Sequence, residues 1–193
     1  MRCLGIDQSL SKCAFTLLED GKPVYHFISK TGKDSVKNKR PDTNYYTTLE
    51  DQIHHVCTGL IDTVEYCCPD TITFESLSYG SVGDATRNLS CLYGAMRETL
   101  VVNFPNITVY EYAPTSIKSY ARDFLLPDRQ VDGVLKTGKP KKVKMDKKLM
   151  VEAVRELYGQ DYLKGYNYSS GLDDLADSTW LAHKTWSSSE ETS

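Results

Sequence analysis

The chain has 193 residues, which predicts a single domain, because domains usually hold about 100–200 residues. Its composition, 40% hydrophobic and 25% charged residues, is typical of a soluble globular protein. The longest apolar run is far shorter than the ~20 residues of a membrane-spanning helix, and the first residues reach an acid at Asp7 without the apolar stretch of a signal peptide. These features exclude a transmembrane protein and predict a cytoplasmic one.

Charge is unevenly distributed along the chain. The 23 basic and 26 acidic residues give a net charge of only −3, but between Arg129 and Lys148 eight basic residues accompany two acids, a local balance of +6. A second basic stretch runs from Lys30 to Arg40. These segments could offer loops to a polyanion such as nucleic acid, or they could be solvated loop charge.

The first part of the sequence predicts a β-meander followed by a helix and a fourth strand. The first strand ends at Asp7, and further strands are expected at Cys13–Leu18 and Val24–Ile28. The run Thr71–Glu75 is typical of another strand. Between them, apolar residues at intervals of three and four predict an amphipathic helix that ends before Pro69. Its apolar stripe consists of Leu49, Ile53, Val56, Leu60 and Val64.

Strands and helices alternate in the rest of the chain. A second apolar stripe predicts a helix over Ala85–Leu100, and a strand is expected at Ile107–Tyr112. Three more helices are predicted over Pro114–Ala121, around Leu149–Leu157, and from Leu172 onward. This order calls for an α/β fold with a mixed five-stranded sheet, a meander followed by alternating strands and helices, flanked by helices.

Four carboxylates are expected to meet at one end of this sheet. Asp7 ends the first strand and Glu75 ends the fourth, so both lie at one edge if these strands are neighbours. Asp174 and Asp177 lie at positions i and i+3 of the last helix, hence on one face. Asp173 is a second candidate for the first acid of this pair, although the spacing to Asp177 favours Asp174. Taken singly, each acid could equally end a strand or cap the helix.

Converging carboxylates without basic partners would repel one another strongly unless divalent cations lay between them. The six cysteines form no C-x-x-C pair, and there is no His or Cys cluster, so the hard oxygen ligands indicate Mg²⁺, with Mn²⁺ as a substitute, rather than zinc. Two such ions could hold a phosphodiester, activate a water molecule and stabilise the leaving oxygen.

Five short segments form an ordered set along the chain. Three of them carry the acids: Gly5-Ile6-Asp7-Gln8-Ser9, Ile72-Thr73-Phe74-Glu75 and Leu172-Asp173-Asp174-Leu175-Ala176-Asp177-Ser178. The other two carry a lysine at a helix start: Pro114-Thr115-Ser116-Ile117-Lys118 and Asp146-Lys147-Lys148. The set resembles the G-I-D-P-S opening, the acid-terminated fourth strand, the closing D-x-x-D-A helix and the two lysine-bearing helix starts of RuvC-like Holliday junction resolvases. The resemblance spans nearly the whole chain and is nearest to the phage-encoded branch, particularly over Ser78–Leu89.

The resemblance implies a single ribonuclease-H-like nuclease domain over residues 1–186. The tail over 187–193 is polar enough to be expected to be disordered. The resemblance also implies a homodimer that resolves four-way DNA junctions by paired Mg²⁺-dependent nicking, in a host cytoplasm if a phage encodes it, with no membrane and no small-molecule cofactor. The small pair Gly94-Ala95 would permit close packing of two copies. Carried over by position, the metal ligands and catalytic acids would be Asp7, Glu75, Asp174 and Asp177, and Lys118 and Lys147 would contact the phosphate near the cut.

Two features depart from the family pattern. Gln8 replaces the usual proline, and the segment from Arg122 to Lys144 is longer than the family's short Gly-rich turn. The second departure leaves the register of the DNA and the substrate preference open.

Further residues are predicted to contact DNA. Tyr79, in a Gly- and Ser-rich segment, could stack on an unpaired base at a junction centre, or it could pack under its own loop. Arg87, on the first turn of the second helix, could bind a phosphate or could be a solvated helix residue. The lysines expected to contact the DNA backbone are Lys136, Lys139, Lys141, Lys142, Lys144 and Lys148.

Three other functions fit parts of the sequence. A less selective nuclease could cut forks, flaps or RNA–DNA hybrids, because substrate shape is read by loops. A non-cleaving junction-binding protein could use the basic segments alone, although its acids would repel DNA without metal. An actin-like ATP-binding fold shares the meander but normally needs a longer chain and glycine-rich phosphate loops.

Overall fold

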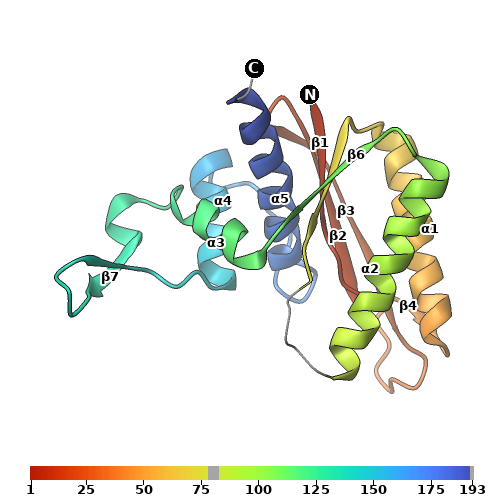
Figure 1. Cartoon of the computed structure of the whole chain (residues 1–193). Helices are drawn as coiled ribbons and strands as arrows, with labels where there is room; N and C mark the ends of the chain where they lie inside the picture. The colour runs from red at the N-terminus through yellow and green to blue at the C-terminus, as the bar shows by residue number, and fades with distance from the viewer. Residues whose placement is uncertain (78–82, 192–193) are drawn as a thin grey trace.

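Figure 1 shows a computed structural model of the chain, which describes residues 1–77 and 83–191. A central sheet lies between two layers of helices, with α1 and α2 on one face and α3, α4 and α5 on the other (Figure 1). The described helices do not include one with the length and apolar character needed to cross a membrane. The helices are α1 (Leu49–Cys67), α2 (Asp84–Asn103), α3 (Pro114–Arg122), α4 (Lys147–Tyr158) and α5 (Leu172–Glu190), with a short 3-10 turn at Pro127–Arg129.

The main sheet is mixed and has the strand order β4-β3-β2-β1-β5-β6. The first three strands form the antiparallel meander, β5 and β6 continue the sheet parallel to β1, and β4 pairs parallel with β3. The strands are β1 (Arg2–Asp7), β2 (Lys12–Glu19), β3 (Lys22–Lys33), β4 (Asn44–Tyr46), β5 (Thr71–Glu75) and β6 (Thr108–Tyr112).

This α/β architecture confirms the predicted fold class, except that the sheet has six strands rather than five. The difference arises at β3, which continues five residues beyond the predicted Val24–Ile28, and whose last residues, Thr31–Lys33, pair with Asn44–Tyr46. Neither segment alternates apolar and polar residues. The pairing therefore depends on backbone hydrogen bonds and on the chain returning at that point, which periodicity does not detect.

Two other segments differ from expectation. The basic segment contains a hairpin, β7 (Val131–Val134) and β8 (Pro140–Lys142), whose residues are all exposed, so it leaves no hydrophobic pattern in the sequence. The prediction of disorder from residue 187 is wrong for 187–190, which form the last turn of α5. That turn is supported because Ser189 donates to the Trp186 carbonyl and to Met1 at the N-terminus.

Strand alternation divides the sheet between two hydrophobic cores. In β1, Leu4 and Ile6 are buried against α1 and α2, whereas Cys3 faces α5 together with Gly5. The same alternation holds in β5, where Ile72 and Phe74 enter the first core. Because successive side chains point to opposite faces, Asp7 and Glu75 at the strand ends lie on the face that α5 covers.

Candidate active site

Asp7 and Glu75 end two neighbouring parallel strands. Ile6 of β1 pairs with Phe74 of β5, so the next residue of each strand is one of these acids. Both line a pocket of about 180 Å³, together with Gln8 and the first turns of α2. The predicted arrangement at one edge of the sheet is therefore present.

The helix α5 crosses directly over these strands and fixes the other acids. A Cβ on Gly5 would lie 1.9 Å from the Ser178 carbonyl oxygen, so only glycine lets the helix approach β1 this closely. Ser178 also forms a buried hydroxyl hydrogen bond of 2.7 Å with Thr16 of β2. These contacts hold the first turns of α5 over the strand ends, where Asp174 and Asp177 lie.

The acids influence one another strongly. Burial raises the pKa of Asp7 well above its usual range, and the negative charges of Asp177, Asp174, Glu75 and Asp173 raise it further. Burial and then repulsion from Glu75 raise the pKa of Asp177 to about 7. Burial also raises the pKa values of Glu75 and Asp174. The five acids therefore behave as one coupled cluster in a poorly solvated place.

Basic side chains accompany this cluster, which corrects the expectation of acids without basic partners. Lys147, the first residue of α4, forms an ion pair with Asp173. Lys12, the first residue of β2, has its Nζ 3.4 Å from Asp174 Oδ2. The charge of Lys118 on α3 opposes the rise in the pKa of Glu75. The predicted lysines thus reach the site, and Lys12 is a third lysine that the motifs did not indicate.

The described residues contain no group of three or more His, Cys, Asp or Glu side chains already arranged around one metal position. Their chemistry nevertheless fits a hard divalent cation. Within the described residues, one buried carboxylate oxygen in each of Asp173, Asp174 and Asp177 receives no hydrogen bond. Lys147 and Lys12 offset part of the charge of the first two, so the charge of Asp177 is the least compensated. Repulsion holds such carboxylates apart, and a cation between them would draw them together.

Asp173 and Asp174 have different roles in this arrangement. The Asp173 side chain is only 4% exposed and is paired with Lys147, and Asp174 is 16% exposed and lies beside Lys12. Asp174 shares a helix face with Asp177, and its charge raises the pKa of Asp7 more than the charge of Asp173 does. The geometry therefore favours Asp174 as the first acid of the pair and makes Asp173 the anchor of Lys147.

Gln8, which departs from the family pattern, has a structural explanation. Its side chain is buried and donates a hydrogen bond to the backbone carbonyl of Glu75. This contact joins the chain after β1 to the end of β5, and it stabilises the spacing between the two strand-end acids.

Comparisons with known proteins identify the architecture. The chain aligns with the Thermus thermophilus RuvC structure in complex with a Holliday junction substrate at a TM-score of 0.64 and 14% identity, covering 100% of this chain and 97% of that one. A second T. thermophilus RuvC structure gives 0.62 and 14%, covering 100% and 98%. The yeast mitochondrial Holliday junction resolvase Ydc2 gives 0.60 and 17%, covering 99% and 80%.

The chain has the ribonuclease-H-like fold of RuvC. At these identities the likeness concerns the fold alone. No protein-family model and no curated protein sequence matches the chain. The sequence resemblance is thus supported in its fold, and the phage branch stays a prediction.

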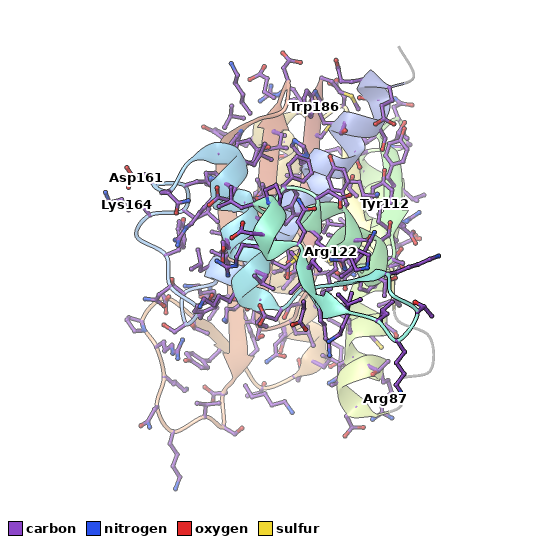
Figure 2. The ribbon with its side chains drawn as sticks, turned by 90° about the vertical axis from the view of Figure 1, so that its left-hand side faces the viewer. Arg87, Tyr112, Arg122, Asp161, Lys164 and Trp186 are labelled. Carbon is purple, nitrogen blue, oxygen red and sulfur yellow. The ribbon has the colours of Figure 1, made fainter. Side chains whose placement is uncertain are left out.

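Within this RuvC fold, the basic hairpin projects away from the body (Figure 1). Its base is fixed, because Arg122 Nε donates to the Val143 carbonyl at 2.9 Å, and Val143 N donates to the Gln130 carbonyl at 2.9 Å. Arg122 is labelled in Figure 2, where α3 meets this segment. Residues further out, including Lys136 and Lys139, are exposed.

The other predicted DNA contacts have mixed outcomes. Arg87 is exposed on the first turns of α2 and forms an ion pair with Asp84 (Figure 2). Lys148 lines a shallow pocket of about 410 Å³ between α4 and the segment before α5. Lys141 pairs with Asp132 across the hairpin at 2.9 Å, and Lys142 and Lys144 are exposed there. Tyr79 lies outside the described residues, so its predicted stacking stays a prediction.

Lys12 could have been found from strand parity. Residues 14 and 16 of β2 face α5, so residue 12 also faces α5, close to the helix start that carries Asp174. What the sequence lacked was the position of α5 over β2, because that contact joins residues 162 positions apart, Thr16 and Ser178.

Proposed function

We propose that this protein is a structure-selective DNA endonuclease that resolves four-way junctions by Mg²⁺-dependent hydrolysis of phosphodiester bonds. The observation that carries the proposal is the cluster of half-buried, mutually repelling acids, Asp7, Glu75, Asp174 and Asp177, at one end of a RuvC fold. Such a cluster is costly to the folded chain, which is the expected condition of a site built for divalent cations. One neighbour of the same fold is described in complex with a Holliday junction substrate.

The proposed roles follow from the position of each side chain. The four carboxylates would hold Mg²⁺ or Mn²⁺, which when bound would supply charge to activate water and to stabilise the leaving oxygen. Lys147 and Lys118 approach the cluster from α4 and α3, where their ammonium groups can neutralise charge that develops on the phosphate. The exposed lysines of the hairpin would bind the DNA backbone at a distance from the cut.

The first test incubates the protein with a labelled four-way junction, a matched fork and a linear duplex, with Mg²⁺ or with EDTA. We expect symmetric cuts in the junction that require Mg²⁺ and that disappear in Asp7→Asn. Equal cutting of the fork would instead indicate a general branch nuclease, and cutting of an RNA–DNA hybrid would indicate a hybrid nuclease. Junction binding without cutting in Mg²⁺ or Mn²⁺ would indicate a binding protein.

We also propose that two copies act together, since two opposed cuts need two sites. The helix α2 offers a surface for this contact, because Gly94 is exposed and a Cβ built on it meets nothing within 4 Å. Cys91 is exposed three residues earlier on the same face. A two-fold contact along this helix would therefore bring the two Cys91 thiols near each other.

This proposal can be tested with a short bismaleimide cross-linker. Cys68 is the other exposed cysteine of the described residues, so a Cys68→Ser background isolates Cys91. We expect a cross-linked dimer at micromolar protein that is lost in Cys91→Ser and in Gly94→Glu. A monomer by sedimentation at this concentration, with and without junction DNA, would contradict the proposed homodimer.

A further inference from the structure

Two lysines oppose each other directly on neighbouring strands. Lys12 of β2 and Lys30 of β3 are register partners in the antiparallel pair. Both face α5, because Ile28, two residues before Lys30, packs in the core on that side. Like charges directly opposite each other on a sheet are destabilising, so the pair favours nearby anions. The described residues supply Asp174 beside Lys12 and Asp42 beside Lys30.

These lysines open onto a cleft that is separate from the pocket of Asp7 and Glu75. The cleft has a volume of about 340 Å³, and a third cation, Arg40, lines it together with them. The other walls are mixed, with Gly32 and Val36 beside polar residues. They include Ser11, Thr31, Asn38, Thr43, Tyr45 and Ser169.

Arg40 is held in place across the cleft. Its backbone N–H donates to the Tyr45 hydroxyl at 2.6 Å, and its guanidinium donates to the Ser169 carbonyl at 3.0 Å. Lys12 Nζ donates to the neighbouring carbonyl of Tyr168 at 3.0 Å. Two cations from distant parts of the chain thus bind the segment before α5 through neutral carbonyl oxygens. These oxygens do not cancel the charge of Arg40, whereas Lys12 also lies 3.4 Å from Asp174 Oδ2.

The acids around the cleft do not cancel its charge. Lys30 Nζ lies 2.5 Å from Asp42 Oδ2, but the Asp42 side chain is 53% exposed, so water or another anion can readily compete for this contact. Asp174 is the acid beside Lys12, and it belongs to the acidic cluster. Lys12 therefore connects the two sites, with the carboxylates on one side of it and the cleft on the other.

We propose that this cleft binds a phosphodiester of the DNA strand that continues from the acidic cluster, with Lys30 and Arg40 as its phosphate ligands. Cations held beside hydroxyl groups, here the half-buried Lys30 and the exposed Arg40, are the chemistry that recognises a sugar–phosphate backbone. The inference rests on the proposed function, since it takes the acidic cluster as the place of the cut. It assigns a DNA contact to the Lys30–Arg40 segment, on the β3 side of that cluster.

The test measures binding of a labelled four-way junction in EDTA by fluorescence anisotropy over a range of salt concentrations. We expect the Lys30→Gln, Arg40→Gln double variant to bind about 10-fold more weakly, and the slope of log affinity against log salt to fall by about 0.9 for each lost phosphate contact. Lys164→Gln is the matched control, because Lys164 is an exposed lysine paired with Asp161 at the edge of the molecule (Figure 2). It should bind like the wild type.

Charge-preserving variants separate binding from a structural role. Lys30→Arg and Arg40→Lys should keep the wild-type salt slope, and thermal denaturation should show that all variants are folded. A wild-type affinity and slope in the double variant would overturn the proposal. So would Lys30→Arg and Arg40→Lys variants as weak as the Gln variants, because that result would make the two residues supports for the β3–β4 loop.

The outcome does not depend on cleavage. If no Mg²⁺-dependent cutting is found but the double variant loses salt-dependent binding, the proposed function fails and the cleft stands as a DNA site. If junctions are cut but the double variant binds like the wild type, the function stands and the cleft proposal fails. Competition by inorganic phosphate alone, without an effect of the variants on DNA binding, would show an anion site that DNA does not use.

Discussion

The acidic cluster and the basic hairpin differ both in the sign of their charge and in its exposure to solvent. The acids lie on strand ends and on a helix that crosses the sheet, and Asp7 has a strongly raised pKa because it is buried. The hairpin, residues 131–142, carries its charge on two short strands and the turn between them, and all of its residues are exposed. Desolvated charges of one sign store unfavourable free energy that a bound cation can relieve, whereas solvated charges cost little and respond to salt.

The largest expected effect comes from removing one buried acid. Asp7→Asn should lower Mg²⁺-dependent cleavage by at least about 100-fold, because a metal ligand is lost. The same change should raise the thermal denaturation midpoint in EDTA at pH 8, since a buried negative charge disappears. Asp161→Asn, at an exposed acid that pairs with Lys164, is the control and should change neither quantity. A lower denaturation midpoint for Asp7→Asn than for the wild type would contradict the interpretation that repulsion at this carboxylate destabilises the fold.

The pH dependence of stability should sharpen the comparison. The pKa of Asp177 is raised from 3.8 to about 7 by burial and then by Glu75, so its proton stabilises the fold below about pH 4, and this contribution is lost as the pH rises through about 7. In EDTA, wild type should therefore lose stability between about pH 4 and 7 relative to Asp177→Asn. Burial lowers the pKa of His183 to about 4, which acts in the opposite direction equally in both proteins. Parallel stability curves for the two proteins would disprove this assignment.

Removal of the hairpin should affect binding and leave the fold intact. Replacing residues 131–142 by two glycines should weaken junction binding about 10-fold at low salt and flatten its salt dependence, because several lysine–phosphate contacts are lost. The denaturation midpoint should change little, since these residues are exposed. Anisotropy titrations and thermal melts measure the two effects. Loss of folding in this deletion would show that the hairpin supports the body, contrary to the comparison.

The smallest expected effects are on stability, and they compare an ion pair with a buried carboxylate to an exposed ion pair. Lys147→Gln leaves the buried Asp173 carboxylate without its partner and should reduce the free energy of unfolding by about 1–3 kcal/mol. Lys141→Gln breaks the exposed pair with Asp132 and should cost less than about 0.5 kcal/mol. Urea denaturation of the two variants at one pH gives the comparison directly. Equal losses of unfolding free energy in the two variants would mean that burial of the carboxylate does not strengthen the ion pair.

Local patterns in the sequence predicted much of the fold. Apolar intervals of three and four predicted α1 and α2, and their stripes enter the first core. The sequence placed Asp7 and Glu75 at the ends of two strands, which share one edge if the strands are neighbours, and the register of β1 and β5 shows that they are. These features follow from periodicity, because each element must bury one face whatever its neighbours are.

The tertiary structure alone decided which charges meet. The sequence determined a mixed α/β fold and a set of acids at element ends. It did not show the sixth strand, the exposed hairpin, or the pairing of Lys12 with Asp174 and of Lys147 with Asp173. Exposed or paired polar residues leave no hydrophobic period, and their partners come from distant segments. Only the packing of α5 across β1 and β2, where Gly5 allows a close approach, brings these side chains together.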